Sequence, residues 1–292
     1  MREDYFTGLI RRYSPPSEPL PVTARLPEAD TAGASVEAPG IRAYLFDVYG
    51  TLFTSASGDI GTLHRADDAP ADSRARELLA PFLEDCGLPR LVSLFAAAVT
   101  AEHAKRREAP AGEQITPEVD VRKIWANILQ TNEEAAADFA LRFELSVNPV
   151  YPMPGLADML GRLASAGIPL GIVSNAQFFT PLLFNAFLNQ TPEALGFLPH
   201  LCVYSFREGV AKPSPPLFQK ASRALAALGI RPHETLYMGN DMLNDIWAAK
   251  QAGFRTALFA GDGRSLRLRE NDPRCAGLKP DFIVKSLLQL IE

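Results

Sequence analysis

Residues 43–53 read Ala-Tyr-Leu-Phe-Asp-Val-Tyr-Gly-Thr-Leu-Phe, a stretch that joins an apolar run to a carboxylate and a turn. The apolar residues 43–46 are typical of a short buried strand, and the run ends at Asp47. Gly50 and Thr51 follow soon after and mark a turn. The stretch therefore predicts a strand that presents the Asp47 carboxylate at the point where it opens into a turn.

Short apolar runs of the same kind recur along the chain, at 169–173, 201–204, 235–238, 256–259 and 282–284. Stretches of helical period lie between these runs, for example at 156–166 and 216–228. This alternation predicts an α/β fold in which helices cover both faces of a parallel sheet. Ligands of such sheets bind beyond the carboxyl ends of the strands, so polar residues at those ends are candidates for a site.

The segment 54–152 interrupts the alternation. It carries helical patterns and no convincing strand, the patterns lying at Ser73–Asp85, Leu91–Arg107, Val119–Leu129 and Glu133–Phe143. An insert of this kind after the first strand predicts an all-helical cap at 54–152, on a core made of 41–53 and 153–292. Within it, Trp125 and Phe143 are expected in the core of the cap helices.

Residues 1–40 form a Pro-rich N-terminal extension, with prolines at positions 15, 16, 19 and 21. Prolines at this density disfavour a regular helix or a central strand. The sequence therefore predicts an extended arm, either packed on the core or left as a disordered tail.

Composition excludes several classes of protein. The chain has 292 residues, of which 47% are hydrophobic, and a net charge of −5, so it has no basic balance that would favour nucleic acid. No apolar run approaches the roughly 20 residues that cross a membrane, and the N-terminus lacks the apolar centre of a signal peptide. We therefore expect a cytoplasmic protein without a membrane or nucleic-acid partner; its oligomeric state is not indicated.

Cysteine and histidine usage argues against two further kinds of site. The three cysteines are far apart and odd in number, and the four histidines are not closely paired; they are Cys86, Cys202, Cys275, His64, His103, His200 and His233. This pattern favours neither a disulfide framework nor a zinc site. No Gly-x-Gly-x-x-Gly follows the first strand, which also disfavours a dinucleotide enzyme.

Four groups of polar residues fall at the ends of the predicted strands. Asp47 can attack an electrophile, Ser174 and Asn175 can hold an anionic group, and Lys212 can neutralise the charge of both. The fourth group, Asn240 to Asp245, carries two carboxylates, whose oxygens suit Mg²⁺. Each group alone is more often a turn, a helix cap or a solvated charge. The order of the four groups and their shared position at strand ends are far more specific evidence of an active site than any one group alone.

These four stretches resemble the motifs of the haloacid-dehalogenase superfamily, over residues 41 to 292. The resemblance implies a Rossmann-like sheet with a helical cap inserted after the first motif. It further implies that Asp47 is the nucleophile, that Lys212 orients the reacting group with Asp47, and that Thr51, Ser174 and Asn175 bind the substrate.

Within this superfamily, the acidic stretch resembles the phosphatase branch. By resemblance, Asp241 and Asp245 hold Mg²⁺ together with Asp47 and the backbone carbonyl of Tyr49. A shifted register would instead place Asn240 toward the metal. The chemistry implied is an in-line attack on phosphorus, an aspartyl-phosphate, and hydrolysis by water.

Tyr49 departs from that branch, which has a second Asp there to protonate the leaving group. Tyrosine, with a pKa of about 10, is a poor substitute. Asp-x-Tyr-Gly-Thr-Leu-Phe resembles instead the metal-independent 2-haloacid dehalogenases, whose halide leaves without a proton. Tyr49 is alternatively a packing residue under the cap. The dehalogenases also need an early cap arginine, for which Arg65, Arg74 and Arg76 are in range, although none lies in a matching motif.

The two acids of the fourth motif favour a Mg²⁺-dependent hydrolase of a small phosphorylated molecule. The alternative is a metal-independent 2-haloacid dehalogenase. A third hypothesis, from another class, is a catalytically weak member that binds a ligand or a protein partner, because the usual general acid is missing.

Overall fold

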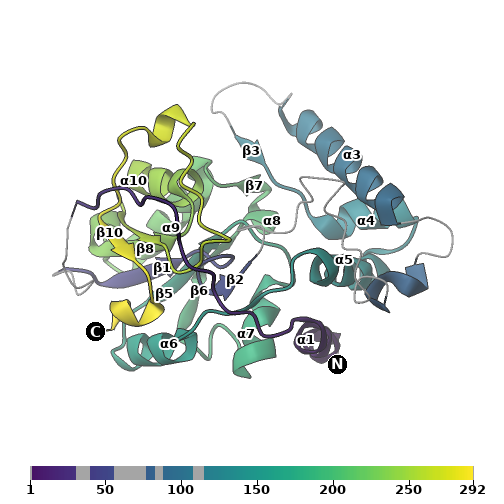
Figure 1. Ribbon diagram of the computed structural model, residues 1–292, viewed down its shortest axis with the longest axis horizontal. Helices are drawn as coiled ribbons and strands as arrows, with labels where there is room; N and C mark the ends of the chain where they lie inside the picture. The colour runs from purple at the N-terminus through teal and green to yellow at the C-terminus, as the bar shows by residue number, and fades with distance from the viewer. Residues whose placement is uncertain (1, 31–39, 56–76, 83–87, 108–114, 292) are drawn as a thin grey trace.

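A six-stranded parallel sheet forms the centre of the molecule (Figure 1). The computed structural model describes residues 2–30, 40–55, 77–82, 88–107 and 115–291. In space the strands follow the order β10 (Phe282–Val284), β9 (Arg255–Phe259), β8 (Thr235–Gly239), β1 (Ala43–Phe46), β5 (Leu170–Ser174) and β6 (Phe197–Tyr204). Each neighbouring pair runs parallel. All six strands overlap predicted apolar runs, although β6 begins four residues before its run at 201–204, so the predicted parallel sheet is confirmed.

Helices cover both faces of this sheet, as β1 illustrates. Tyr44 and Phe46 belong to the apolar cluster that contains residues of α6 (Leu156–Ser165) and α7 (Thr180–Leu188). Ala43 and Leu45 belong instead to the cluster of α9 (Pro215–Ala227) and α10 (Ala248–Gln251). Because alternate side chains of a strand point to opposite faces, the strand is apolar throughout.

The parallel arrangement brings the predicted polar groups to one edge of the sheet. Strands β1, β5 and β8 are adjacent and end at Phe46, Ser174 and Gly239, respectively. After β8 the chain enters a π-helical segment, η4 (Met242–Trp247). The remaining short elements are β7 (Val210–Ala211), α8 (Ser205–Glu208), η3 (Pro232–Glu234), η5 (Pro273–Cys275) and η6 (Leu287–Leu290).

Between β1 and α6, the described residues contribute three helices to the right of the sheet in Figure 1: α3 (Leu88–Arg107), α4 (Val121–Leu129) and α5 (Glu133–Val147). Trp125 is buried among them, with ring centroids 4.5 Å from Phe139 and 4.8 Å from Phe95. Trp125 and Phe143 are therefore core residues, as predicted. No helix in the described ranges is long and apolar enough to cross a membrane. That this insert serves as a cap stays a prediction.

The expectation that 54–152 holds no strand is wrong. β2 (Phe53–Thr54) pairs with β4 (Tyr151–Pro152), and β3 (Thr116–Pro117) pairs with β7 of the core. Strands of two residues are too short to show alternation, so no sequence pattern marks them. Of the helical pattern predicted at 73–85, the structure describes residues 77–82, in which 77–79 are helical and lead into the short turn η2 (Ala80–Phe82); the rest lies outside the described residues.

The N-terminal extension also differs from its prediction as an extended arm, because residues Arg2–Tyr13 form the helix α1. This part precedes the first proline, and its Phe6, Leu9 and Ile10 are buried at helical spacing. The helix packs against α7 and α5. Beyond it the chain is extended and crosses the core towards β10 (Figure 1). Of the two alternatives for this segment, the contacts of α1 favour the one that packs on the rest of the chain.

Candidate active site

Asp47 is buried at the carboxyl end of β1. Its Oδ1 accepts a 2.7 Å hydrogen bond from Lys212 Nζ, and the Ser174 side chain also bonds to the carboxylate. Burial raises the pKa of Asp47 to about 7, the charge of Asp245 acts in the same direction, and the Lys212 ammonium acts against both. The carboxyl group therefore depends on an adjacent cation to be an anion at neutral pH.

Lys212 joins two carboxylates. Its buried ammonium donates to Asp47 Oδ1 at 2.7 Å and to Asp245 Oδ1 at 2.6 Å. Burial lowers the pKa of Lys212, but the charges of Asp245 and Asp47 outweigh this effect and raise the pKa above its ordinary value. The backbone N–H of Lys212 donates to Asn175 Oδ1 at 2.8 Å, which fixes the residue against the end of β5. Four predicted site residues, Asp47, Asn175, Lys212 and Asp245, thus form one cluster.

Tyr237 is a member of this cluster that the sequence did not reveal. Its hydroxyl lies 2.8 Å from Asp245 Oδ1, 3.1 Å from Lys212 Nζ and 2.9 Å from the carbonyl oxygen of Val173. Burial and the negative charge of Asp245 raise the pKa of Tyr237 well above its ordinary value, so the phenol stays protonated. Tyr237 lies within the apolar run of β8, where the pattern indicates only a core residue.

Ser174 and Asn175 are buried at the end of β5, next to β1. Ser174 Oγ lies 3.1 Å from the carbonyl oxygen of Asn175, and Asn175 in turn holds the backbone of Lys212. Both residues therefore lie beside Asp47 and Lys212, as the four-group pattern predicts.

The turn after Asp47 packs tightly on the loop after β8. Gly50 has a φ of 80°, and a Cβ there would lie 2.6 Å from Asn240 Nδ2, so this turn requires glycine. Thr51 Oγ1 donates to Asn240 Oδ1 at 3.1 Å. The buried Tyr49 hydroxyl lies 2.9 Å from Thr180 Oγ1, at the start of α7. This contact supports the packing interpretation of Tyr49.

The loop after β8 sends its three candidate side chains in different directions. Asn240 Nδ2 donates to the carbonyl oxygen of Ser265 at 2.6 Å, while its Oδ1 faces Thr51. Asp245 reaches the Lys212 ammonium, and a Cβ on Gly239 would overlap it at 2.3 Å. Asp241 caps η4 by accepting from the N–H groups of Leu243 and Asn244.

Asp241 is also held by Arg269, a second residue that the sequence did not reveal. The guanidinium Nε lies 3.1 Å from Oδ1 and 3.0 Å from Oδ2, and an Nη lies 2.5 Å from Oδ2. Arg269 follows β9 by ten residues and belongs to no motif. Arg65, Arg74 and Arg76, the candidate substrate arginines, lie outside the described residues.

The donor types around Asp47 suit Mg²⁺, because Asp47, Asp241 and Asp245 supply hard carboxylate oxygens. Their present partners are cationic side chains, Lys212 for two of them and Arg269 for the third. Among the residues that the structure describes, no three His, Cys, Asp or Glu side chains converge as a metal-binding group. The donor set therefore fits a divalent cation in chemistry, provided that Asp241 is released by Arg269.

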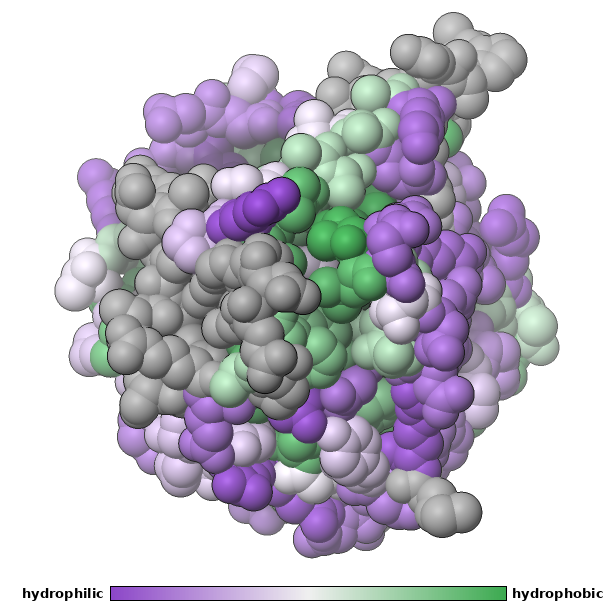
Figure 2. Space-filling model, turned by 90° about the vertical axis from the view of Figure 1, so that its right-hand side faces the viewer, coloured by the Kyte–Doolittle hydropathy of each residue, from purple (hydrophilic) through white to green (hydrophobic). Residues whose placement is uncertain are grey.

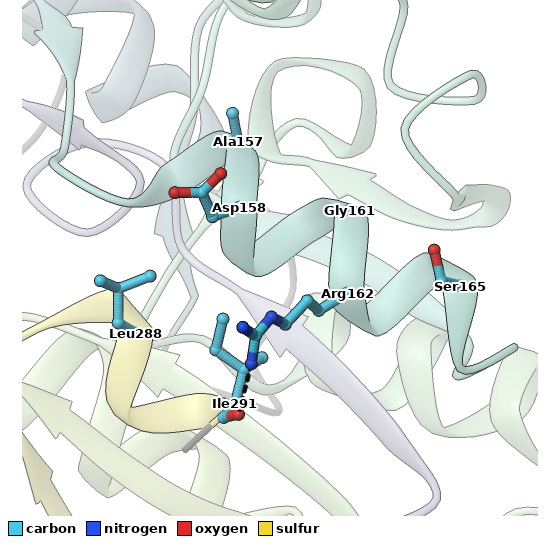
Figure 3. Close-up of a pocket in the computed structure, with 7 residues that line it drawn as sticks. All are labelled: Ala157, Asp158, Gly161, Arg162, Ser165, Leu288 and Ile291. Atoms are coloured by element: carbon cyan, nitrogen blue, oxygen red, sulfur yellow. Dashed lines mark hydrogen bonds between the residues drawn. The ribbon is translucent and has the colours of Figure 1, made fainter.

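A surface groove of about 810 Å³ between α6 and η6 is separate from this cluster (Figure 3). Arg162 crosses it to donate to the carbonyl oxygen of Ile291 at 3.3 Å. The groove is lined by Ala157, Asp158, Gly161, Arg162, Ser165, Leu288 and Ile291. No residue of the four motifs lines it, so it is not a candidate for the reaction described by those motifs.

A smaller cavity of about 60 Å³ lies where the helical insert meets the loop after β5. Aromatic side chains line part of it, with Phe95, Trp125 and Phe143 from the insert and Phe179 from the core. Gln177 joins the two parts, because its Nε2 donates to the Val119 carbonyl oxygen at 2.8 Å. On the insert side of the molecule, hydrophobic surface gathers near the middle of the face (Figure 2).

The family model of haloacid dehalogenase-like hydrolases matches residues 41–253, which include all four motifs. The chain belongs to this family. The match begins at residue 41, as predicted from the motifs, and ends at residue 253 rather than at 292.

Curated relatives of this haloacid dehalogenase-like hydrolase carry phosphatase names. The phosphoglycolate phosphatase of Shigella boydii is 32% identical over 73% of this chain and 79% of its own length. The glyceraldehyde 3-phosphate phosphatase of Pyrococcus furiosus is 30% identical over 48% of this chain and 53% of its own length. The phosphoglycolate phosphatase of Escherichia coli is 37% identical over 38% of this chain and 40% of its own length. The chain thus spans about half the length, or less, of the last two relatives.

Among solved structures, the 2-haloacid dehalogenase of Pseudomonas syringae aligns with a TM-score of 0.52 and 20% identity. The alignment covers 86% of this chain and 96% of the other. At this identity the likeness shows the common fold.

Proposed function

We propose that this chain is a phosphatase that hydrolyses a small phosphorylated molecule through a covalent intermediate on Asp47, with Mg²⁺ as its cofactor. The observation that carries the proposal is the presence of two acids, Asp241 and Asp245, in the loop that packs on Asp47 and its turn. A halide-releasing enzyme has no need of this second acid. The phosphatase names of the relatives support the same choice.

In the proposed reaction, an Asp47 oxygen attacks phosphorus and the bond from phosphorus to the leaving oxygen breaks. Water then attacks the phosphorus of the aspartyl-phosphate, which releases inorganic phosphate and restores the carboxylate. Lys212 compensates the charge of Asp47 and of the phosphoryl oxygens. Ser174, Asn175 and Thr51 would hold those oxygens at the strand ends.

A bound Mg²⁺, held by Asp47, Asp241, Asp245 and the Tyr49 carbonyl, would supply further positive charge beside the phosphoryl group. Tyr49 itself is a poor acid, with a reference pKa of about 10, and its hydroxyl already pairs with Thr180. The leaving oxygen would therefore take its proton from solvent. We expect leaving groups of low pKa, such as aryl or acyl phosphates, to react much faster than alkyl phosphates.

The runner-up is a metal-independent 2-haloacid dehalogenase, favoured by Tyr49 in place of a second aspartate. In this reaction Asp47 would displace halide, which leaves without a proton. A further alternative is a binding protein with weak catalysis. Neither alternative gives a catalytic role to Asp241. Cytoplasmic residence and the absence of nucleic-acid and membrane partners stay predictions.

Parallel assays distinguish these functions: phosphate release from p-nitrophenyl phosphate, and chloride release from 2-chloropropionate, each with Mg²⁺ and with EDTA. We expect Mg²⁺-dependent phosphate release that is lost in Asp47→Asn. Chloride release that is indifferent to EDTA would establish the dehalogenase instead. If neither product forms, the chain is a binding member and the proposal is wrong.

A further inference from the structure

In the pair between Arg269 and Asp241, one carboxylate oxygen of Asp241 has a single hydrogen-bond partner among the described residues. Asp241 Oδ1 accepts from the N–H of Leu243 at 2.8 Å, from the N–H of Asn244 at 3.1 Å, and from Arg269. Oδ2 accepts only from Arg269, within the described part of the chain. A carboxylate offers about four acceptor positions. Oδ2 is therefore the oxygen that becomes available if Arg269 moves.

The two partners differ in exposure. The Asp241 side chain is 8% exposed, whereas that of Arg269 is 41% exposed. The carboxylate is also fixed by the start of η4, because it caps that segment. The guanidinium thus borders solvent, whereas the backbone N–H groups at the start of η4 hold Asp241 in position.

The loop that carries Arg269 is anchored independently of this pair. Arg267 binds the acidic loop through two backbone hydrogen bonds: its N–H donates to the Asn240 carbonyl oxygen at 3.0 Å, and its carbonyl oxygen accepts from the Met242 N–H at 2.8 Å. Arg269 itself has a φ of 54°, a conformation that costs a residue with a side chain about 1 kcal/mol or more. The backbone is thus held so that the guanidinium faces Asp241.

The N-terminal extension adds to this anchoring. The backbone of Leu20 forms two hydrogen bonds with the start of the loop. Its N–H donates to Asp262 Oδ1 at 2.9 Å, and its carbonyl oxygen accepts from the Gly263 N–H at 2.8 Å. Arg264 donates to Ser17 Oγ at 2.9 Å. A Cβ at Gly263 would lie 2.5 Å from the carbonyl oxygen of Pro21, so glycine permits this close approach.

We propose that Arg269 competes with a divalent cation for Asp241: it neutralises the carboxylate in the metal-free protein and turns toward solvent when the cation takes Oδ2. The inference rests on the proposed function, in which Asp241 is a metal ligand. Arg269 then sets the concentration of the divalent cation at which the site becomes occupied.

The test measures Mg²⁺ binding to the full chain by isothermal titration calorimetry, without substrate. Arg269→Gln removes the competing charge but keeps an L side chain at the same backbone position. Because a partly exposed ion pair contributes about 1 kcal/mol, we expect Mg²⁺ to bind roughly five- to tenfold more tightly to this variant. Arg269→Lys, which retains the charge but not the two-pronged contact, should lie between the two.

Arg274→Gln is the matched control. Arg274 forms a similar two-pronged pair with Asp272, and its side chain is 45% exposed. Its loss should leave Mg²⁺ affinity unchanged, whereas Asp241→Asn should abolish or strongly weaken binding. Circular dichroism of each variant would establish that it is folded.

If wild type and Arg269→Gln bind Mg²⁺ equally, or if the variant binds more weakly, the competition is refuted while the proposed phosphatase stands. If Asp241→Asn binds as wild type does, the competition is refuted as well. If no protein of the series binds Mg²⁺, both the competition and the metal dependence of the proposed function fall.

Discussion

Asp245 of η4 and its N-cap Asp241 are both buried, but their cationic partners differ in exposure. Asp245 and its partner Lys212 have side chains 1% and 3% exposed, and Tyr237 closes the same cluster. Asp241 is nearly as buried, but its partner Arg269 is 41% exposed. The contact of Asp245 is thus part of the interior, whereas the cation on Asp241 is in contact with solvent.

This difference suggests that the two acids of this loop have different roles. A buried ion pair is costly to break, because the remaining charge is left without a partner. An exposed guanidinium recovers hydration when it leaves a carboxylate. We therefore assign a permanent structural and electrostatic role to Asp245 with Lys212, and an exchangeable one to Asp241.

The largest effect should come from Lys212→Met, which leaves Asp47 and Asp245 buried without their shared cation. We expect turnover to fall by about 10³-fold or more and the free energy of unfolding to fall by about 3–5 kcal/mol. Enzyme assays and urea denaturation measure the two. Lys220→Met is the control, since its pair with Glu208 is on the surface and should matter little. A mild effect of Lys212→Met would refute the permanent role.

A paired comparison of Asp245→Asn and Asp241→Asn should separate the two acids. Asp245→Asn weakens hydrogen bonds between charged groups in the interior, so it should lower the free energy of unfolding by about 1.5–3 kcal/mol. Asp241→Asn should lower it by about 1 kcal/mol or less, because asparagine can still cap η4. Urea denaturation in EDTA measures both. The division of roles would be contradicted if Asp241→Asn were the more destabilising.

Tyr237→Phe should have a smaller effect. It removes the hydroxyl that contacts Asp245 and Lys212 but leaves the ring in place. We expect a loss of about 1 kcal/mol in the free energy of unfolding and, if Lys212 shifts, a several-fold lower kcat with KM unchanged. Steady-state kinetics and urea denaturation check this. Unchanged kcat would show that the hydroxyl has no part in holding Lys212.

Tyr49→Phe should have the smallest effect on turnover, less than about twofold, because its hydroxyl pairs with Thr180 rather than serving as an acid. Stability should fall by about 1 kcal/mol, the value of an ordinary buried hydrogen bond. Kinetics with an alkyl phosphate give the most sensitive measurement, since a poor leaving group needs an acid most. A loss of about 100-fold would make Tyr49 the general acid.

The sheet and most of the site could be predicted because the information lies in local runs. Each strand is an apolar run, and parallel strands bring Asp47, Ser174 and the acidic loop to one edge whatever the details. The helix α1 was missed because the prolines after Ser14 outweighed the apolar spacing of Phe6, Leu9 and Ile10. That apolar spacing was the signal in the sequence that could have predicted the helix.

The register of the acidic loop could not be predicted for a different reason. Asn240 and Asp241 are adjacent, and a π-helical segment follows them, so helical spacing does not decide which one faces Asp47. Tyr237 and Arg269 reach the site from a strand interior and from a distant loop. Only tertiary structure brings such residues together, and no local pattern reports them.

Asp47 would be identified as the nucleophile by trapping the covalent adduct that it forms during turnover. The full chain with Mg²⁺ and p-nitrophenyl phosphate would be quenched in acid during turnover and digested, and the peptide containing Asp47 weighed by mass spectrometry. We predict a peptide heavier by one phosphoryl group on Asp47, which hydroxylamine removes and which Asp47→Asn lacks. Phosphate release that persists in Asp47→Asn, with no adduct in either protein, would contradict the account.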